Sequence, residues 1–221
     1  IRRAAAADRS DFLTVGDANS RKDNAILITL GVITDTHVPD RAERLAPQAL
    51  DVFRQAKVDA ILHAGDVCVQ GALDDLAKIA PVHAVFGNRD VYRLPELPIH
   101  QTLTFNGVKV GLAHGHENWK NYVTDKFVIA FTGLRPEPYI RRLLPVFPDA
   151  DVIVFGHLHI PVQKWVNGKL FFNPGSACCP YRWGKYPPAV GLLYIEGKGK
   201  ISAEIVPFSP KAEIMPTPEA S

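Results

Sequence analysis

Residues 152–159 read VIVFGHLH, and they join the pattern of a buried strand to two imidazoles. The four residues 152–155 form an unbroken apolar run, which is typical of a strand buried on both faces. Gly156 separates that run from His157 and His159, whose spacing of two places both side chains on one side of an extended segment. Because a core has little use for two imidazoles, we expect this strand to deliver them into a functional site.

Four other apolar runs also end in polar residues. They are ILITLGVIT (26–34) before Asp35 and His37, VDAILHA (58–64) before Asp66, PVHAVF (81–86) before Asn88, and VKVGLA (108–113) before His114. In an open α/β sheet, ligands bind in the crevice outside the carboxyl ends of the strands. We therefore expect these side chains to meet at one rim, although they span about 125 residues of sequence.

The residue types at these strand ends are typical of a metal site. The predicted ligands are Asp35, His37, Asp66, Asn88, His114, His157 and His159. This mixture of nitrogen and oxygen donors suits Mn, Zn or Fe(II) better than Ca or Mg, and the lack of thiolates argues against a structural zinc site. Seven donors are too many for one tetrahedral ion but fit two ions that share a carboxylate. Two ions about 3.5–4 Å apart bind a phosphate and lower the pKa of a bridging water.

The rest of the chain predicts one α/β domain. Strands expected at 25–34, 58–64 and 81–86 alternate with helices at 42–57, with a start at Pro47, and at 71–80, so a largely parallel sheet covered by helices is expected. Hairpins follow at 100–113, 161–172 and 189–208, the first two with Asn-Gly turns. We expect a single domain at 25–208, a loose extension at 1–24 and a loose tail at 209–221.

Composition excludes several classes of protein. Of the 221 residues, 47% are hydrophobic and 22% charged, and the net charge of +2 predicts neither a general nucleic-acid surface nor a membrane surface. No apolar stretch reaches the ~18 residues of a membrane span. The three cysteines, two of them adjacent, predict reduced thiols and a cytoplasmic protein. A homo-oligomer remains open.

The ordered motifs resemble those of the calcineurin-like metallophosphoesterase superfamily. They are Asp35-x-His37, Gly65-Asp66, Gly87-Asn88, His114-Gly115 and Gly156-His157-x-His159. The short loops and Asn173-Pro174-Gly175-Ser176 resemble its small YfcE-type phosphodiesterase branch. The resemblance covers roughly residues 28–208, and it implies a two-sheet β-sandwich flanked by helices, in four layers α/β/β/α.

The resemblance also implies roles for the site residues. One metal would be held by Asp35, His37, Asp66 and His159, and the other by Asp66, Asn88, His114 and His157, so that Asp66 bridges. A bridging hydroxide would attack phosphorus, with Asp66, Asn88, Arg89 and His114 as catalytic residues. The implied protein is a dinuclear metal-dependent phosphodiesterase acting on a small-molecule or nucleotide-type diester. Mn is the expected metal, with Fe, Zn, Ni and Co as alternatives.

Arg89 departs from the family pattern, because many relatives have a histidine that protonates the leaving group there. A guanidinium cannot act as an acid near neutral pH, but it can bind phosphate oxygens through two bonds. We predict substrate contacts for Arg89, Arg182 and His116, with a surface role for His116 equally open. Asp90 is expected to orient Arg89 or a ligand histidine.

Other readings remain for the function and for several residues. The departure at Arg89 leaves room for a metal-binding interaction scaffold with little catalysis, like the retromer subunit of this family, and also for a phosphomonoesterase or nucleotide pyrophosphatase. His63 and His83 are expected to be core or strand-pairing residues, and the 173–176 loop is expected either to frame the site or to form a plain turn. Trp119, Phe127 and Phe131 are expected to pack the insert 117–147, which should be mostly helical, onto the body.

Overall fold

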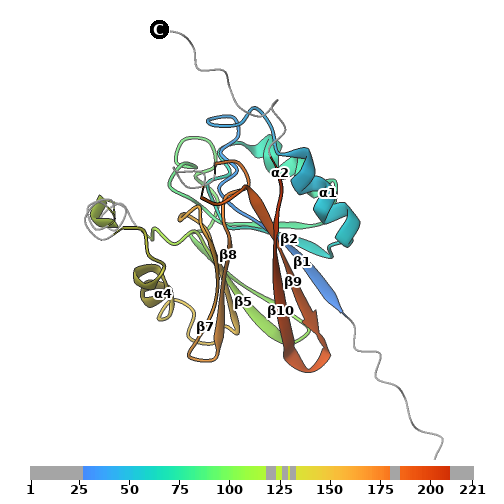
Figure 1. The fold of residues 1–221 in the computed structure, drawn as a ribbon, viewed down its shortest axis with the longest axis vertical. Coiled ribbons are helices and arrows are strands. Elements are labelled where there is room, and N and C mark those ends of the chain that lie inside the picture. The colour runs from blue at the N-terminus through green and yellow to red at the C-terminus, as the bar shows by residue number, and fades with distance from the viewer. Residues whose placement is uncertain (1–26, 118–122, 126–128, 130–132, 180–184, 210–221) are drawn as a thin grey trace, which may run out of the picture.

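The computed structural model describes residues 27–117, 123–125, 129, 133–179 and 185–209 (Figure 1). The predicted extension 1–24 and all but residue 209 of the predicted tail lie outside these ranges, as do Trp119, Phe127, Phe131 and Arg182.

The first sheet has the strand order β10-β9-β1-β2-β3. Its strands are β1 (Ile28–Ile33), β2 (Ala60–His63), β3 (Val82–Ala84), β9 (Ala189–Glu196) and β10 (Lys200–Pro207). β1, β2 and β3 are parallel, with Leu30 beside Ala60 and Ile61 beside Val82, which confirms the parallel half of the prediction. The late hairpin adds its two strands antiparallel to the same sheet, with Thr29 opposite Tyr194.

The second sheet has the order β4-β5-β6-β8-β7. Its strands are β4 (His100–Phe105), β5 (Val108–Ala113), β6 (Val152–Phe155), β7 (Pro161–Val166) and β8 (Lys169–Pro174). β5, β6 and β8 run parallel, while β4 and β7 each complete a hairpin. Both Asn-Gly turns are confirmed: Asn106, Gly107, Asn167 and Gly168 all have positive φ, as two-residue hairpin turns of this kind require.

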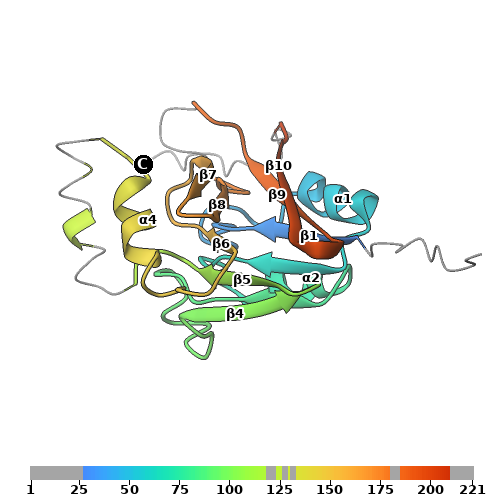
Figure 2. The same ribbon diagram turned by 90° about the horizontal axis from the view of Figure 1, so that it is seen from below.

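Helices cover the outer faces of the two sheets (Figure 2). α1 (Pro47–Ala56) begins at the predicted Pro47, and α2 (Gln70–Ala77) follows β2. α4 (Glu137–Leu143), in the predicted helical insert, starts after Pro136, and a short 3₁₀ turn, η1 (Gly197–Gly199), joins β9 to β10. The predicted fold, two sheets between helices, is confirmed.

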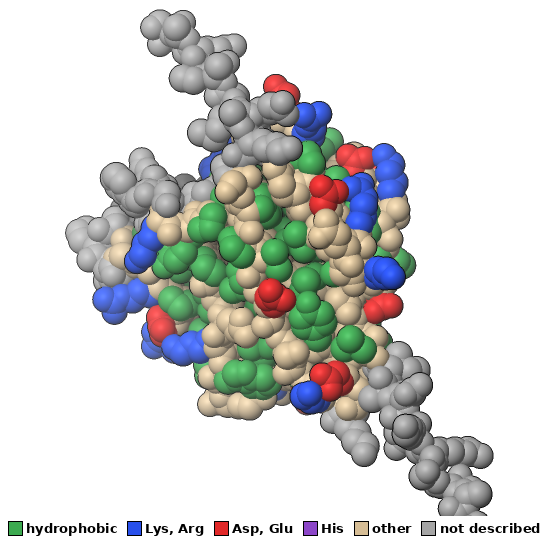
Figure 3. Space-filling view, turned by 45° about the vertical axis from the view of Figure 1, so that its right-hand side comes forward, with side chains coloured by type: hydrophobic (Ala, Val, Ile, Leu, Met, Phe, Trp, Pro, Cys, Tyr) green, Lys and Arg blue, Asp and Glu red, His purple; other side chains and the backbone are tan. Residues whose placement is uncertain are grey.

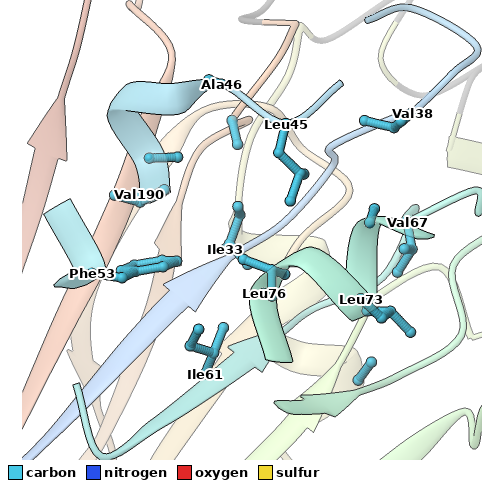
Figure 4. Close-up of a cluster of buried hydrophobic side chains, with 14 of the residues drawn as sticks. Ile33, Val38, Leu45, Ala46, Phe53, Ile61, Val67, Leu73, Leu76 and Val190 are labelled. Atoms are coloured by element: carbon cyan, nitrogen blue, oxygen red, sulfur yellow. The ribbon is translucent and has the colours of Figure 1, made fainter. Parts of the chain in front are cut away.

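Three apolar cores hold these layers together. In the first, Phe53 of α1 and Leu76 of α2 point toward Ile33 and Ile61 of the first sheet (Figure 4). The second lies between the sheets and includes the alternate residues Leu30 and Val32. The third packs α4 on the second sheet, with Tyr139, Ile140 and Leu143 against residues that include Ile153 and Phe155. Strands such as β6 are thus buried on both faces, which is why their sequences are continuous apolar runs.

The surface in Figure 3 mixes apolar and polar side chains at its centre, with charges of both signs mostly toward the rim. Such a mixture is ordinary for a folded domain. Within the described residues, no helix combines the length and the apolar character needed to cross a bilayer.

Candidate metal centre

All seven predicted ligands lie together where the loops leave the carboxyl ends of β1, β2, β3, β5 and β6. His37, Asp66, Asn88, His157 and His159 line one hollow of about 220 Å³. Asp35 and His114 lie beneath it and are 0% and 1% exposed. The convergence inferred from the strand ends is therefore observed.

Three donor atoms form the first group. His37 Nε2 lies 3.2 Å from His159 Nε2, and His159 Nε2 lies 3.2 Å from Asp35 Oδ1. His37 Nε2 is 3.9 Å from Asp35 Oδ1 and 3.7 Å from Asp66 Oδ2. Two donors each about 2.1 Å from one cation, at 90–110° to each other, would be about 3.0–3.4 Å apart. The spacing of these atoms is therefore close to that of a divalent coordination sphere.

A second group lies on the other side of Asp66. Asp35, Asp66 and His114 each offer an atom within 4.8 Å of the others. Asp66 Oδ1 is 3.4 Å from His114 Nε2, which is 3.2 Å from His157 Nδ1. The two oxygens of Asp66 thus face His114 and His37, so the position expected for a bridging carboxylate lies between the groups.

Backbone carbonyls orient two of the imidazoles. His114 Nδ1 donates to the carbonyl of Ala64 at 2.7 Å, and His159 Nδ1 donates to the carbonyl of Cys179 at 2.5 Å. In the neutral imidazole, each bond leaves the lone pair on Nε2, which is the atom that faces the other donors. Metal-ligating histidines are typically held in this way by a bond from their second nitrogen.

Two oxygens of the site are among the buried side-chain atoms that have no hydrogen-bond partner in the described residues. They are Oδ1 of Asp35 and Oδ1 of Asn88. Buried polar atoms are nearly always hydrogen-bonded, and an orphaned one calls for an ion or another explanation. Asp35 belongs to both donor groups, and Asn88 lines the hollow beside them, so these residues fit divalent cations.

Burial determines the electrostatics of the site. It raises the pKa of Asp66 to about 6, and the nearby Asp35 carboxylate adds to this effect. It lowers the pKa of His37 to about 3 and that of His157 well below its usual value. Asp35 is also desolvated, yet the imidazoles of His159, His114 and His37 hold its pKa below the ordinary range. Burial opposes charge on His114 and His159 as well, but the Asp66 and Asp35 carboxylates outweigh it and raise the pKa of both imidazoles. A cation between these closely spaced carboxylates and imidazoles would offset the cost of their burial.

The backbone is also unusual at these positions. Asp35, His37, Asp66, His157 and His159 all have positive φ, between 49° and 70°. Non-glycine residues in this region cost of order 1–3 kcal/mol each, and they cluster at functional sites. The cost is tolerated where the turn aims a side chain into the site.

A model of the calcineurin-like phosphoesterase superfamily domain matches residues 28–198. The chain belongs to this superfamily. It is 34% identical over 177 residues to a probable metallophosphoesterase of Methanothermobacter thermautotrophicus, covering 80% of this chain and 91% of the relative. A probable metallophosphoesterase of Methanocaldococcus jannaschii is 33% identical over 179 residues, covering 81% of each chain. The predicted family of metal-dependent phosphoesterases is confirmed.

Solved structures share the fold of this phosphoesterase domain. A predicted phosphoesterase of Streptococcus pneumoniae superposes with a TM-score of 0.59 at 22% identity, covering 82% of this chain and 90% of the other. Vacuolar protein sorting 29 of Cryptosporidium parvum gives 0.57 at 25% identity, covering 83% and 99%. The zinc complex of Vps29 from Entamoeba histolytica gives 0.56 at 26% identity, covering 81% and 99%.

Gly156, in the opening motif, lies where other residues of the candidate metal centre closely approach the backbone. A Cβ at this position would lie 2.0 Å from Thr34 Oγ1, 2.7 Å from the Ala64 carbonyl oxygen and 3.0 Å from Asp35 Oδ2. No L side chain fits without moving the loop that carries His157.

The Gly156→Ala variant is therefore expected to lose about 1–3 kcal/mol of unfolding free energy and most of its metal binding. Urea denaturation and metal titration by calorimetry would measure both. Gly71→Ala in α2 is the matched control, because a Cβ there meets nothing within 4 Å. A Gly156→Ala variant with the control's metal affinity would contradict the close-packing account.

Asp90 has a different role from the predicted one. Its side chain is fully buried, and it binds backbone N–H groups rather than Arg89 or a histidine. Oδ2 accepts from Gly87 at 2.7 Å and from Asp66 at 3.1 Å, and Oδ1 accepts from Cys68 at 2.7 Å. Burial raises the pKa of Asp90, although these N–H groups oppose that effect. Asp90 thus ties the Asp66 loop to the Gly87–Asn88 loop.

The 173–176 loop frames the site, as one of its two interpretations proposed. Asn173 Nδ2 donates to the carbonyl of Gly156 at 2.9 Å, and its Oδ1 accepts from the Gly175 N–H at 2.9 Å. Ser176 Oγ donates to the carbonyl of Asp35 at 2.8 Å. This loop therefore fixes the backbone beside two of the predicted ligands.

Among the predicted substrate contacts, Arg89 lines the hollow and Arg182 lies outside the described residues. His116 is not a surface histidine, since it is 7% exposed and its ring lies near those of His114 and His157. Arg41 also lines the hollow, and we did not predict it. Its only sequence signal is its place four residues after His37, whose carbonyl accepts the Arg41 N–H.

One prediction about individual residues needs correction. The structure joins Cys178 and Cys179 as a vicinal disulfide, whereas three reduced cysteines were expected; Cys68 is free and buried. His83 is half-buried in β3, where it pairs with Leu62 of β2 as expected for a pairing residue, and its ring packs against Phe105. His63 is fully buried and bonds to Thr36 Oγ1 at 3.1 Å, as expected for a core histidine.

Proposed function

We propose that this protein is a phosphodiesterase that uses two divalent metal ions. The observation that carries the proposal is the pair of donor groups around Asp66, with an unpartnered oxygen on Asp35 within them and another on Asn88, which lines the same hollow. Asp35, His37, Asp66 and His159 would hold one ion, and Asp66, Asn88, His114 and His157 the other. When bound, such ions polarise a phosphoryl oxygen and lower the pKa of a bound water.

The chain's own residues bind and orient the substrate. Arg41 and Arg89 stand at the hollow with no ion-pair partner among the described residues, so both guanidinium groups are available for phosphate oxygens. Arg89 does not supply a proton near neutral pH. The site therefore favours esters with good leaving groups.

A second hollow adjoins the first, and this neighbouring space makes a diester the favoured substrate. Asn88 and Arg89 line both. A phosphoryl group held at the donor groups would thus have space on one side for a second ester arm. A monoester would leave that space to solvent.

Initial rates on bis(p-nitrophenyl) phosphate and on p-nitrophenyl phosphate, with Mn²⁺ added, test the proposal. We expect kcat/KM to be roughly tenfold higher for the diester. EDTA should remove the activity, and Mn²⁺ should restore it. Faster hydrolysis of the monoester would instead favour a phosphomonoesterase.

A metal-binding interaction scaffold is the second candidate, because Vps29 proteins of two organisms share the fold at 25% and 26% identity. A protein that binds metal tightly but turns over neither ester would support this candidate.

Mn is the proposed metal. Fe, Zn, Ni and Co also suit a mixed imidazole and carboxylate site. The zinc complex of the Entamoeba histolytica relative supports a divalent transition metal in this fold. Metal analysis of the protein as isolated would identify the ion, and rates with each metal after chelation would rank them.

A further inference from the structure

The loop after β3 presents three side chains on the outer surface beside the metal centre. Successive turns shape it, since the N–H of Asp90 donates to the carbonyl of Gly87, and the N–H groups of Arg93 and Leu94 both donate to the carbonyl of Asp90. Asp90 and Leu94 point inward and are 0% and 1% exposed. The same turns leave Arg89, Tyr92 and Arg93 outside.

These outer side chains line the second hollow, which has a volume of about 400 Å³. Its walls are Asp40, Asn88, Arg89, Tyr92 and Arg93. Asn88 and Arg89 also line the hollow at the metal centre, so the two hollows are adjacent and share these residues as walls. A molecule whose phosphate lies at the metal centre would extend past these two side chains to reach Tyr92 with one substituent.

The charges around the second hollow suit a phosphodiester. Asp40 is paired with Arg93 at 2.9 Å, and this pairing lowers the pKa of Asp40. The pair has no net charge, so Asp40 offers little repulsion to an anion. Arg89 adds a positive charge at the junction of the two hollows.

Tyr92 is the unusual member of this set, because its side chain is 93% exposed. An aromatic ring left in water at the edge of a binding site is a platform on which a planar group can stack. Bases stack on such rings without regard to their identity, since every base has a π face.

We propose that the second hollow binds one ester arm of the phosphodiester substrate and that Tyr92 stacks on a planar aromatic group in that arm, a nucleobase or an aryl ring. This inference rests on the proposed function and narrows its substrate class. Arg89 would then bind the phosphate end of this arm, and Tyr92 would select for an aromatic group at its other end.

Three p-nitrophenyl phosphodiesters that differ only in their second arm test this inference. The arms are thymidine 5′-yl, phenyl and methyl, and all three release p-nitrophenolate. We expect kcat/KM to be about tenfold higher for an aromatic arm than for methyl, and Tyr92→Ala to bring that ratio close to one. Tyr92→Phe should keep it. A preference for thymidine over phenyl would identify the nucleoside as the source of the aromatic group.

Val91→Ala is the matched control, because Val91 lies in the same loop, is 49% exposed and does not line the hollow. Equal ratios in wild type and Tyr92→Ala would overturn the inference, and would be the result if Tyr92 contacts a protein partner instead. Failure of the proposed function is distinguishable, because none of these three diesters would then be hydrolysed.

Binding supplies a second measurement that does not depend on turnover. Calorimetry on the metal-loaded protein should show thymidine 5′-monophosphate binding about tenfold more tightly than methyl phosphate, with the difference lost in Tyr92→Ala. If wild type binds both equally, the stacking role is wrong even where diesters are hydrolysed.

Discussion

The Asp66→Asn variant is expected to lose metal-dependent phosphodiester hydrolysis by about a thousandfold or more. One carboxylate faces both donor groups, with Oδ1 3.4 Å from His114 Nε2 and Oδ2 3.7 Å from His37 Nε2. Asparagine keeps the shape but removes the charge and one acceptor oxygen. Metal ions contribute several kcal/mol of transition-state stabilisation, and about 4 kcal/mol corresponds to a thousandfold in rate.

The fold should survive this change. An amide oxygen can still accept the Arg89 N–H, which Oδ1 of Asp66 accepts at 2.8 Å. Burial already disfavours charge at this position, as the pKa of about 6 indicates. The melting temperature without metal should therefore stay close to that of wild type. Added Mn²⁺ should raise the melting temperature of wild type and leave that of the variant unchanged.

Asp74→Asn is the matched control for this experiment. Asp74 is exposed on α2 and accepts a bond from the Gln70 side chain at 2.9 Å. Its variant should keep wild-type rates and the same rise in melting temperature with Mn²⁺. More than a tenth of the wild-type activity in Asp66→Asn would rule out a bridging role for Asp66.

Most of the site was predictable because it lies at strand ends. His157 follows an apolar run that is buried on both faces, and Asp35 and Asp66 follow runs of the same kind. The carboxyl ends of parallel neighbours must lie at one edge of a sheet, so order along the chain was enough to bring these side chains together. The hairpins were equally accessible, since Asn-Gly is the preferred pair for a tight turn of positive φ.

Such patterns do not predict which strands pair when they are far apart in the sequence. The apolar run at 189–195 predicted a strand, but nothing in it indicates that β9 pairs with β1 rather than with the nearer β8. Periodicity reports burial and not the identity of the neighbour. The place of Arg41 in the hollow could not be predicted for a similar reason. An exposed arginine in a loop has no local sequence pattern that indicates its approach to Asn88 and His157.

Asp90 shows why loop carboxylates are hard to interpret from sequence. Its acceptors bind N–H groups of Asp66 and Cys68, more than twenty residues away in the chain. A carboxylate beside Arg89 in sequence suggests an ion pair, but the turn at Gly87 directs it inward instead. Asp90 can accept hydrogen bonds from both loops only because the tertiary structure brings the loops together.

The Asp90→Ala variant is expected to lose about 3 kcal/mol or more of unfolding free energy. Three buried N–H groups would lose their acceptor, and each such loss costs about 1–3 kcal/mol. Because this is a large share of the stability of a typical domain, the alanine variant should be partly unfolded at 37 °C. Urea denaturation followed by circular dichroism would measure the loss.

The Asp90→Asn variant distinguishes the effect of the hydrogen bonds between the two loops from the effect of a general loss of stability. One amide oxygen can still accept from Gly87 and Asp66, as Oδ2 does, but the amide nitrogen would face the Cys68 N–H. We expect a loss of about 1–3 kcal/mol and a metal affinity weaker by about 10–100-fold, since the loop of Asp66 would no longer be held.

Asp59→Asn provides the comparison that decides between these effects. Asp59 also accepts a backbone bond, from Thr29 at 2.8 Å, but it precedes β2 and so lies at the opposite end of the sheet from the metal centre. Its variant should keep the wild-type metal affinity, because the exposed amide oxygen can still accept the Thr29 N–H far from the site. If Asp90→Asn and Asp59→Asn weaken metal binding equally, the hydrogen bonds of Asp90 do not position the predicted metal ligands. If only Asp90→Asn weakens it, the geometry of the donor groups depends on a carboxylate that touches neither metal nor substrate.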